Sequence, residues 1–541
     1  DNTNSLYTEK LYATSNPTLL ENSKKGKYTE TRGEERQTYG DVMLNLSKTF
    51  KEKFSLDAHI GASIKDNRFD ELSVYGPIAG APNIFNVVNL DKSQKKTPKT
   101  GWHEQTQSFF YSLELGWKSQ LFVTTTGRND WASQLKGSNP TSFFYPSVGL
   151  SAVISEMVTL PKAIDYLKVR GSFSSVGTPY PRFLVQPTYS YDPTKQDWNA
   201  KTHYPIGKLK PERTDSWEIG VDGTFFKDFK VSGSFYYANT YNQTFDPKIT
   251  VSSGYSTLYV QTGYVRNLGV EGLLSYGHTW RDFGWNCNFT FSWNKNKIVE
   301  LVKDYVHPET GEIVNKDRLE LKGLGYTKFI LKEGGTLGDL YTNADFIRDD
   351  KGYIQIDKNG DVAKTDNLPD IKLGSVFPKA NLAWNNSFSY KGIYAGFQLS
   401  ARLGGIVYSA TQAALDQYGV SEASAAARDR GGVLVNGRSW VNAQQYYEIV
   451  ATSSGLPQYY TYSATNLRLQ EAHIGYTIPR KWLGNICDIN VSVVGRNLWM
   501  IYCKAPFDPE AIATTSNFYQ GIDYFMMPST RNFGFNVKIN F

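Results

Sequence analysis

One acidic stretch of the sequence resembles a metal-binding motif. In IDKNGDV, Asp357, Asn359 and Asp361 stand two residues apart, as at the start of a calcium loop of the form D-x-[DN]-x-[DN]-G. The glycine comes early, however, and no glutamate closes the loop at the twelfth position. Because an Asn-Gly turn explains the same residues, we expect a turn here and no metal site.

Other residue types that perform chemistry are scattered along the chain. The sequence has no HExxH, GxSxG or P-loop pattern, and its three cysteines, at 287, 487 and 503, form no CxxC pair. The six histidines, at 59, 103, 203, 278, 307 and 473, do not cluster. We therefore expect no enzyme, no cofactor, no zinc site and no disulfide framework.

Aromatic residues are the remaining candidates for contact with a substrate. Trp131, Tyr341, Trp440 and Tyr519 lie in or beside long connecting segments, where they could stack on sugar rings or line a peptide groove. Tyrosine and tryptophan are also enriched at membrane rims and at protein interfaces. The sequence leaves both interpretations open for each of the four residues.

The elements that must position these residues are strands. The chain ends in RNFGFNVKINF, in which apolar residues alternate with polar or small ones, and the same pattern runs through 54–65, 283–294 and 393–403. A period of two places successive side chains on opposite faces of a strand, here one apolar and one polar. His59 and Arg402 fall on the polar face.

The length of these segments separates a membrane barrel from a soluble sandwich. Roughly fifteen segments can be drawn, most of them about ten to fifteen residues long, which suits strands that cross a membrane at a tilt. Strands of soluble sandwiches are usually about five or six residues long. No run of about 18 apolar residues exists, which excludes a membrane-spanning helix. We therefore predict an all-β fold, a transmembrane antiparallel β-barrel. The predicted strands begin near Gln37, Phe54, Gln105, Leu121, Phe143, Tyr166, Thr214, Phe229, Val265, Phe283, Asn381, Ile393, Thr465, Ile489 and Asn532.

Short and long connections alternate between these segments. Links such as FKEK, GWKSQ and SYKGI are tight, whereas those at 66–104, 298–374 and 408–462 are long. Outer-membrane barrels have short periplasmic turns and long extracellular loops, so we assign the long connections to the outside. SATQAALDQYG and EASAAARD predict two short helices within the connection 408–462.

This assignment fixes the direction of the strands. The last strand follows a long connection, so it runs from the outside to the periplasm, and Phe541 lies at the periplasmic rim. With about fifteen strands, the first strand runs the same way and places residue 1 outside. Because single-chain bacterial barrels have even strand numbers, we expect an incomplete barrel in this chain.

Several stretches resemble the SusC/RagA-type TonB-dependent outer-membrane transporters. LKPERTDSWEIGVDGTFF followed by FYYANTYNQ is similar to that family's strand pair with the pattern LKPE-T-SFE-G-D. NLGVEGLLSYGHTW with FSWNKNKIVEL resembles its N-GVE strand, and EGGTLGDLYTNADFIRDDKGYIQIDKNGD resembles its glycine-rich loop. Further matches are ATNLRLQEAHIGYTIP, VVGRNLWMIYCKAPFDPE and QGIDYFMMPSTRNFGFNVKINF. The resemblance covers most of the chain from about residue 120 onward.

The resemblance implies a barrel of 22 strands, about seven of which precede this chain. Residues 1–541 are then the C-terminal portion of the barrel, without the plug domain, the TonB box and the first strands. It also implies import of nutrient oligomers, oligosaccharides or peptides, through the outer membrane of a Gram-negative bacterium. The implied partners are TonB, outer-membrane lipid and a SusD-type lipoprotein that lies as a lid over the extracellular face. The segments 178–212 and 241–263 resemble loops that act near the hinge of that lid.

The polar face and the net charge complete the sequence-based expectations. His59 is expected to line the lumen, and Arg402 to contact the plug or line the channel, because plugs of large barrels dock on polar walls. The net charge of +6 is small for 541 residues, and KSQKK at 92–96 is expected to be a solvated loop, so we expect no nucleic-acid partner. A passive porin and a surface protein that binds through its large loops remain as alternative functions.

Overall fold

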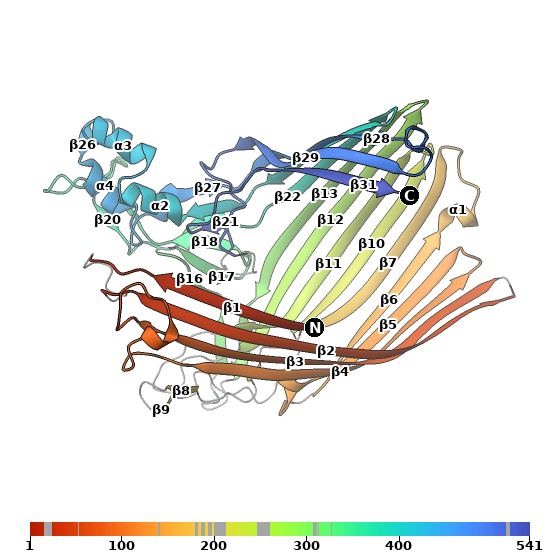
Figure 1. Ribbon diagram of the computed structural model, residues 1–541, viewed down its shortest axis with the longest axis horizontal. Coiled ribbons are helices and arrows are strands. Elements are labelled where there is room, and N and C mark those ends of the chain that lie inside the picture. Colours follow the sequence, from red (N-terminus) through yellow and green to blue (C-terminus); the bar gives the residue numbers. More distant parts are fainter. Residues whose placement is uncertain are drawn as a thin grey trace.

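One large antiparallel sheet dominates the computed structural model (Figure 1). Each of its sixteen strands pairs with the sheet strands that come before and after it in the chain. The strands are β1 Asn2–Leu11, β2 Lys27–Phe50, β3 Phe54–Pro77, β4 Lys99–Trp117, β5 Leu121–Ala132, β6 Phe143–Val153, β7 Ile164–Thr178, β10 Glu212–Phe225, β11 Phe229–Phe245, β12 Val260–Trp280, β13 Phe283–Glu300, β22 Ala380–Tyr390, β23 Ile393–Leu403, β28 Asn466–Ile478, β29 Asp488–Cys503 and β31 Asn532–Asn540. The structure describes residues 1–15, 24–51, 53–138, 141–178, 182–184, 190–192, 197–199, 212–245, 260–306, 311, 313–325, 327–514 and 520–541.

The sheet curls around a central space, with its strands running side by side (Figure 1). β1 and β31 form its two edges, and no ladder joins them in the described part of the chain. The fold confirms the predicted antiparallel barrel architecture, and the described strands leave the barrel open between β1 and β31.

Alternation along each strand separates two surfaces. In the ladder between β2 and β3, Leu44 lies opposite Ile60, and these residues are 70% and 48% exposed. The next pair, Asn45 and His59, is polar and shares a hydrogen bond of 2.6 Å. The period of two therefore gives the sheet an apolar outer face and a polar inner face.

The longest strands extend beyond the membrane. β2 and β3 have 24 residues each, whereas about 9–11 tilted residues cross a bilayer. On the outer face of β3 the apolar row ends at Ile64 and is followed by an ion pair of 3.2 Å between Arg68 and Asp66. On β2, Arg36 pairs with Glu34 at 3.0 Å. These charges place this part of the wall in water, toward the long connections.

Tight turns join the strands at one end of the sheet. In the turn between β22 and β23, Lys391 has φ 47° and Gly392 has φ 89°, the left-handed backbone that a two-residue hairpin requires. A glycine meets this requirement without strain at the second position. The connection between β6 and β7 is slightly longer and contains helix α1, Ile154–Met157. The opposite end carries the long connections.

The N-terminal edge of the sheet differs from the prediction in its first strand, in the start of β2 and in the position of residue 1. The sheet has sixteen strands rather than about fifteen, because NTNSLYTEKL in β1 is polar on both faces and shows no clear alternation. β2 begins at Lys27, before its predicted start near Gln37. With the additional strand, β1 runs toward the long connections. Its first residue lies partway along the wall, where the Asp1 ammonium donates to the Gln37 carbonyl at 2.8 Å, and not at the extracellular end.

The long connections contain the remaining secondary structure. None of the helices in the described residues is long and apolar enough to cross a membrane. The two predicted helices are confirmed as α2 and α3, and α4 was not predicted. The elements are β8 Ser190–Asp192, β9 Asp197–Asn199, β14 Val302–Val306, β15 Ile313–Lys316, β16 Arg318–Lys322, β17 Lys328–Lys332, β18 Asp339–Thr342, β19 Asp345–Phe346, β20 Lys364–Thr365, β21 Ile371–Ser375, β24 Ile406–Ser409, α2 Ala410–Gln417, α3 Glu422–Asp429, β25 Val433–Val435, β26 Ser439–Val441, α4 Ala443–Val450, β27 Thr461–Ser463 and β30 Ile522–Asp523.

Phe397 and Gln398 are neighbours on opposite faces of β23 and provide a matched test of the face assignment. Phe397→Arg places a cation on the apolar face and is expected to cost about 2–4 kcal/mol near the bilayer midplane, whereas Gln398→Arg on the inner face is expected to be mild. Denaturant unfolding of the protein in lipid vesicles measures both free energies. Equal costs for the two variants would contradict the assignment.

Candidate functional site

A charged cluster lies on the inner face of β7, β10 and β11. The Arg170 guanidinium pairs with the Asp222 carboxylate and lies 3.6 Å from the carboxylate of Glu218. Ser232 donates its hydroxyl to Asp222 at 2.6 Å. Small polar residues beside this cluster leave a hollow of about 480 Å³, which Glu271 also lines. Lys168 lies opposite Asp222 in the ladder between β7 and β10, so this wall carries cations and carboxylates side by side, together with many hydrogen-bonding groups.

His59 belongs to another part of the same inner wall. Its Nδ1 lies 2.6 Å from Asn45 Oδ1, and Ser47 donates to Asp57 at 2.5 Å in the next row. These short contacts show that polar side chains of β2 and β3 hydrogen-bond to one another across the two strands on the inner face. In the residues that the structure describes, no group of three or more His, Cys, Asp or Glu side chains is placed to hold a metal ion.

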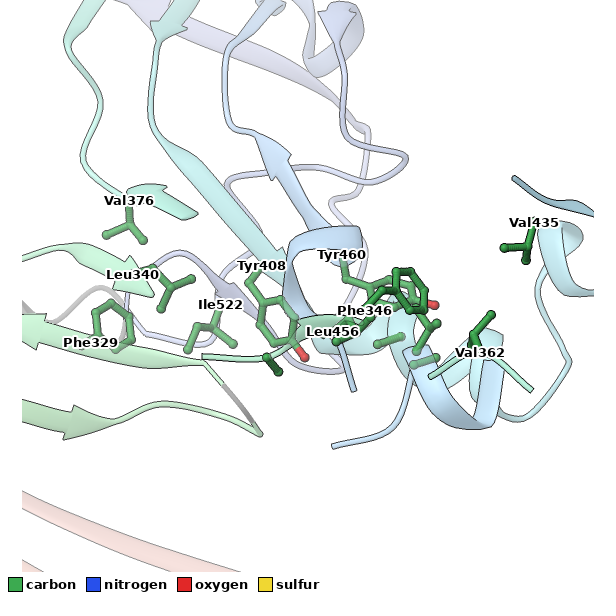
Figure 2. Packing of buried hydrophobic residues seen from close by; sticks show 14 of the residues in the cluster. Phe329, Leu340, Phe346, Val362, Val376, Tyr408, Val435, Leu456, Tyr460 and Ile522 are labelled. Carbon is green, nitrogen blue, oxygen red and sulfur yellow. The ribbon is translucent and has the colours of Figure 1, made fainter. Parts of the chain in front are cut away.

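The connections that follow β13, β23 and β29 form a second body, which we call the extracellular module (Figure 1). Its hydrophobic core draws on all three connections (Figure 2). Phe329 and Leu340 come from the first, Tyr408 and Leu456 from the second, and Ile522 from the third. Each of these residues is at most 5% exposed. Segments separated by membrane strands therefore fold as one unit outside the membrane.

Buried polar groups are satisfied inside the module. Tyr460, 4% exposed, donates its hydroxyl to Asp416 Oδ2 at 2.9 Å, and Asp416 is 6% exposed. Burial and the neighbouring Asp416 carboxylate raise the pKa of Tyr460, so this phenol remains a neutral donor. Burial also raises the pKa of Tyr408 to about 12. The module thus contains specific polar contacts as well as a hydrophobic core.

Two arginines on the inner wall contact the connections that build the module. Arg402 in β23 donates from Nη2 to the carbonyl oxygen of Val376 at 2.9 Å. Arg468 in β28 forms a two-pronged ion pair with Asp508, with N–O distances of 2.7 and 3.2 Å. Burial alone raises the pKa of Asp508, but the hydrogen bond from Arg468 and one from the Glu510 backbone lower it below its usual range.

The predicted aromatic residues do not form one site. Trp131 is 47% exposed and lies on the outer face of β5, in the position of a membrane-rim aromatic. Tyr341 lies in β18 within the module, with the Lys372 ammonium 5.9 Å from its ring centre. Trp440 lies in β26 on the module surface and is 57% exposed. Tyr519 and most of 178–212 and 241–263 lie outside the described residues.

The acidic stretch of the sequence forms a turn. Asp357 Oδ1 accepts the backbone N–H groups of Asn359 at 2.8 Å and Asp361 at 3.0 Å, and Gly360 has φ 86°. This carboxylate oxygen is therefore occupied by the turn itself, which supports the interpretation as a structural turn.

The pairing of Arg468 with Asp508 is a feature that the sequence reasoning missed. The two residues stand in ATNLRLQ and PFDPE, stretches that carried the family resemblance without a role. A charged residue within an otherwise alternating strand was the available signal. The Cys287 side chain lies on the apolar outer face of β13, and its sulfur accepts a hydrogen bond from the indole N–H of Trp384 at 3.1 Å.

Sequence comparisons match the chain to proteins described as β-barrel receptors. A family model described as "TonB dependent receptor-like, beta-barrel" matches residues 2–498. TonB-dependent receptor P3 of Formosa agariphila is 24% identical over 567 residues, covering 96% of this chain and 55% of that protein. TonB-dependent receptor SusC of Bacteroides thetaiotaomicron is 24% identical over 246 residues, covering 40% of this chain and 24% of that protein.

Solved structures share the fold over the whole chain. The RagAB peptide importer in its "closed-closed" state matches with a TM-score of 0.77 at 17% identity, covering 100% of this chain and 59% of that chain. In its "open-open" state the TM-score is 0.76 at 16% identity. The chain thus spans about half the length of the P3 receptor.

The buried contact between Tyr460 and Asp416 provides a test of the module as a folded unit. Tyr460→Phe removes the donor to Asp416 Oδ2, which leaves this buried carboxylate with a bond of 3.3 Å from Gln412 to Oδ1, and is expected to lower the local stability of the module by about 1–3 kcal/mol. Tyr459→Phe is the matched control, since Tyr459 is 41% exposed and its hydroxyl, among the described residues, accepts a single long bond of 3.4 Å from Arg348. Amide exchange measures both variants, and an equal effect would contradict the assignment.

Proposed function

The chain belongs to the TonB-dependent receptor-like β-barrel family, of the SusC/RagA type, and from this premise we propose that it forms the barrel of an active importer. Like the members of this family, it is a protein of the Gram-negative outer membrane. The cargo is a nutrient oligomer, an oligosaccharide or a peptide, and the energy comes through TonB. The match of the family model over residues 2–498 carries this proposal.

The domain assignment is part of the proposal. Residues 1–541 form the C-terminal portion of the barrel, and the same protein supplies a plug domain, a TonB box and further strands. Two observations support this: the P3 receptor is about twice as long as the chain, and β1 covers β2 only as far as Gln37 in the described residues. The edge of β2 from 38 to 50 needs a partner, because an unpaired strand edge is not stable in lipid.

The charged inner wall around Arg170 is the proposed contact for the plug. The hollow of about 480 Å³ is lined by residues of β7, β11, β12, β13 and β22, among them serine, threonine and asparagine residues. Such a wall is hydrated when it is empty and can form hydrogen bonds with a folded plug. Its mixture of carboxylates and cations favours a plug surface that carries complementary charges of both signs.

A SusD-type lipoprotein is the proposed lid on the extracellular module. The module presents large apolar side chains to solvent: Tyr418 is 76% exposed, Val420 68% and Trp440 57%. Leu434, which lies opposite Trp440 in the β25–β26 hairpin, is 46% exposed. Exposed large apolar side chains mark candidate protein interfaces, and we call these four residues the lid seat.

The lid seat can be tested by co-purification. The double change Tyr418→Asp and Val420→Asp places two charges at the proposed interface and is expected to weaken retention of the lipoprotein by about tenfold or more. Trp482→Asp is the control, because Trp482 is 64% exposed but lies in a short turn at the opposite, periplasmic end of the barrel. Retention of the lipoprotein at the wild-type level by the double variant would count against the lid seat.

Energy coupling separates the importer from a passive porin. Deleting the TonB box of the full-length protein is expected to abolish growth on the cognate oligomer, because the plug then stays in the barrel. Removing the plug as well is expected to give a wide, non-selective pore in planar bilayers, since a barrel of this size has a large lumen. Growth that is unimpaired without the TonB box would replace the importer by the porin.

A further inference from the structure

Two wall arginines connect the extracellular module to the barrel. Arg402 lies near the extracellular end of β23, and its side chain reaches the carbonyl of Val376, a residue of the module core that is 1% exposed. Arg468 lies on the neighbouring strand β28, on the same inner face. Their ladder positions are diagonal, because Arg402 is opposite Asn466 and Arg468 is opposite Ser400.

Arg468 forms the stronger of the two contacts. Its side chain is 5% exposed and that of Asp508 is 10% exposed, so the two-pronged ion pair is removed from solvent. Glu510 lies 3.4 Å from the same guanidinium and accepts a hydrogen bond from Asn466 at 3.2 Å. A buried two-pronged pair is costly to break, because the partner left behind is an unpaired charge.

The connection that carries Asp508 also contains a segment that belongs to the module, beyond Asp508 in the chain. Its strand β30 pairs in parallel with β24, where Tyr408 lies opposite Ile522. Asp523 accepts hydrogen bonds from Ser409 at 2.5 Å and from Thr411 at 3.0 Å, at the first turn of α2. One connection is therefore fixed to the wall through Asp508 and to the module through Asp523.

Each arginine takes most of its partners from the connections and few from the wall. The Nε atoms of Arg402 and Arg468 are buried, and neither has a hydrogen-bond partner among the described residues. Within the described part of the wall, Asn497 alone accepts from Arg468, at a long 3.4 Å. Leaving a buried N–H unpaired is unfavourable, so the position of these guanidiniums is set by the groups they hold.

We propose that Arg402 and Arg468 are positioning residues that fix the extracellular module over the mouth of the lumen and so hold the lid seat in its docking orientation. The part of this inference that concerns the lid rests on the proposed function. The part that concerns the module rests on the contacts alone. Neither arginine touches cargo in this role.

Amide exchange of the full-length protein in detergent tests the first part. Tyr408 and Ala513 report on the place where the connection that carries Asp508 pairs with the module. The N–H of Tyr408 donates to the carbonyl of Gly521 and that of Ala513 to the carbonyl of Ile522, both at 2.8 Å. Arg468→Gln and Arg402→Gln are expected to accelerate exchange at these amides by about tenfold or more, with barrel strands unchanged. Arg402→Gln removes a single bond to a neutral acceptor, so it remains informative if Arg468→Gln fails to fold.

Arg496→Gln is the matched control. Arg496 lies on the inner wall in β29 and pairs with Glu471 of β28 at 2.9 Å, but its side chain is 66% exposed and forms no hydrogen bond or ion pair with the module in the described residues. We expect this variant to leave exchange at Tyr408 and Ala513 unchanged. Arg468→Lys keeps the charge but loses the two-pronged geometry, and it is expected to restore part of the protection.

Co-purification of the lipoprotein tests the second part. Both glutamine variants are expected to lose retention of the lid, and Arg496→Gln is expected to keep it. Unchanged exchange in both variants, or equal acceleration in Arg496→Gln, would overturn the role in fixing the module. Faster exchange with full retention of the lid would overturn the link to docking. If the wild-type protein retains no lipoprotein, the proposed lid fails, and exchange still decides whether the arginines fix the module.

Discussion

Backbone hydrogen bonding in lipid is the constraint on which the rest of this structure depends. An N–H or C=O group left unpaired in hydrocarbon costs several kcal/mol, so each membrane-crossing segment must pair along its whole length. An antiparallel meander meets this demand with neighbours in the chain, and the order of the strands in the sheet is their order in the sequence. The turn at Lys391 and Gly392 shows how little chain such a connection needs.

The same constraint explains why specific chemistry gathers outside the membrane. Irregular backbone is excluded from the lipid-facing wall, so the long connections have to build their own hydrophobic core. Phe329, Tyr408 and Ile522 come from three connections that membrane strands separate, yet they pack in one cluster (Figure 2). Such a unit needs a defined attachment to the barrel. The buried pair of Arg468 and Asp508 provides it at the level where the wall meets the connections.

The sequence was sufficient to locate those strands in which apolar and polar residues alternate without interruption. Clean alternation located β3, β13 and β23 at their first residues, because only one side of each strand meets lipid. β1 escaped detection since it is polar on both faces, and this error placed residue 1 at the extracellular end instead of partway along the wall. Contacts within the module were beyond sequence reasoning, because residues such as Asp416 and Tyr460 meet only after their connection has folded. Trp131 shows the related limit: its strand was found, but the direction of its side chain depends on register.

The assignment of one face to lipid and the other to a water-filled lumen is the central claim, and accessibility along β23 tests it most directly. A spin label placed at each position from 395 to 401 in the full-length protein, reconstituted in lipid vesicles, reports collisions with oxygen from the bilayer and with a water-soluble nickel complex. The account predicts a period of two, with oxygen favoured at Ala395, Phe397, Leu399 and Ala401 and nickel favoured at Gly396, Gln398 and Ser400. Accessibility that changes smoothly along the strand, or that shows the opposite phase, would contradict it.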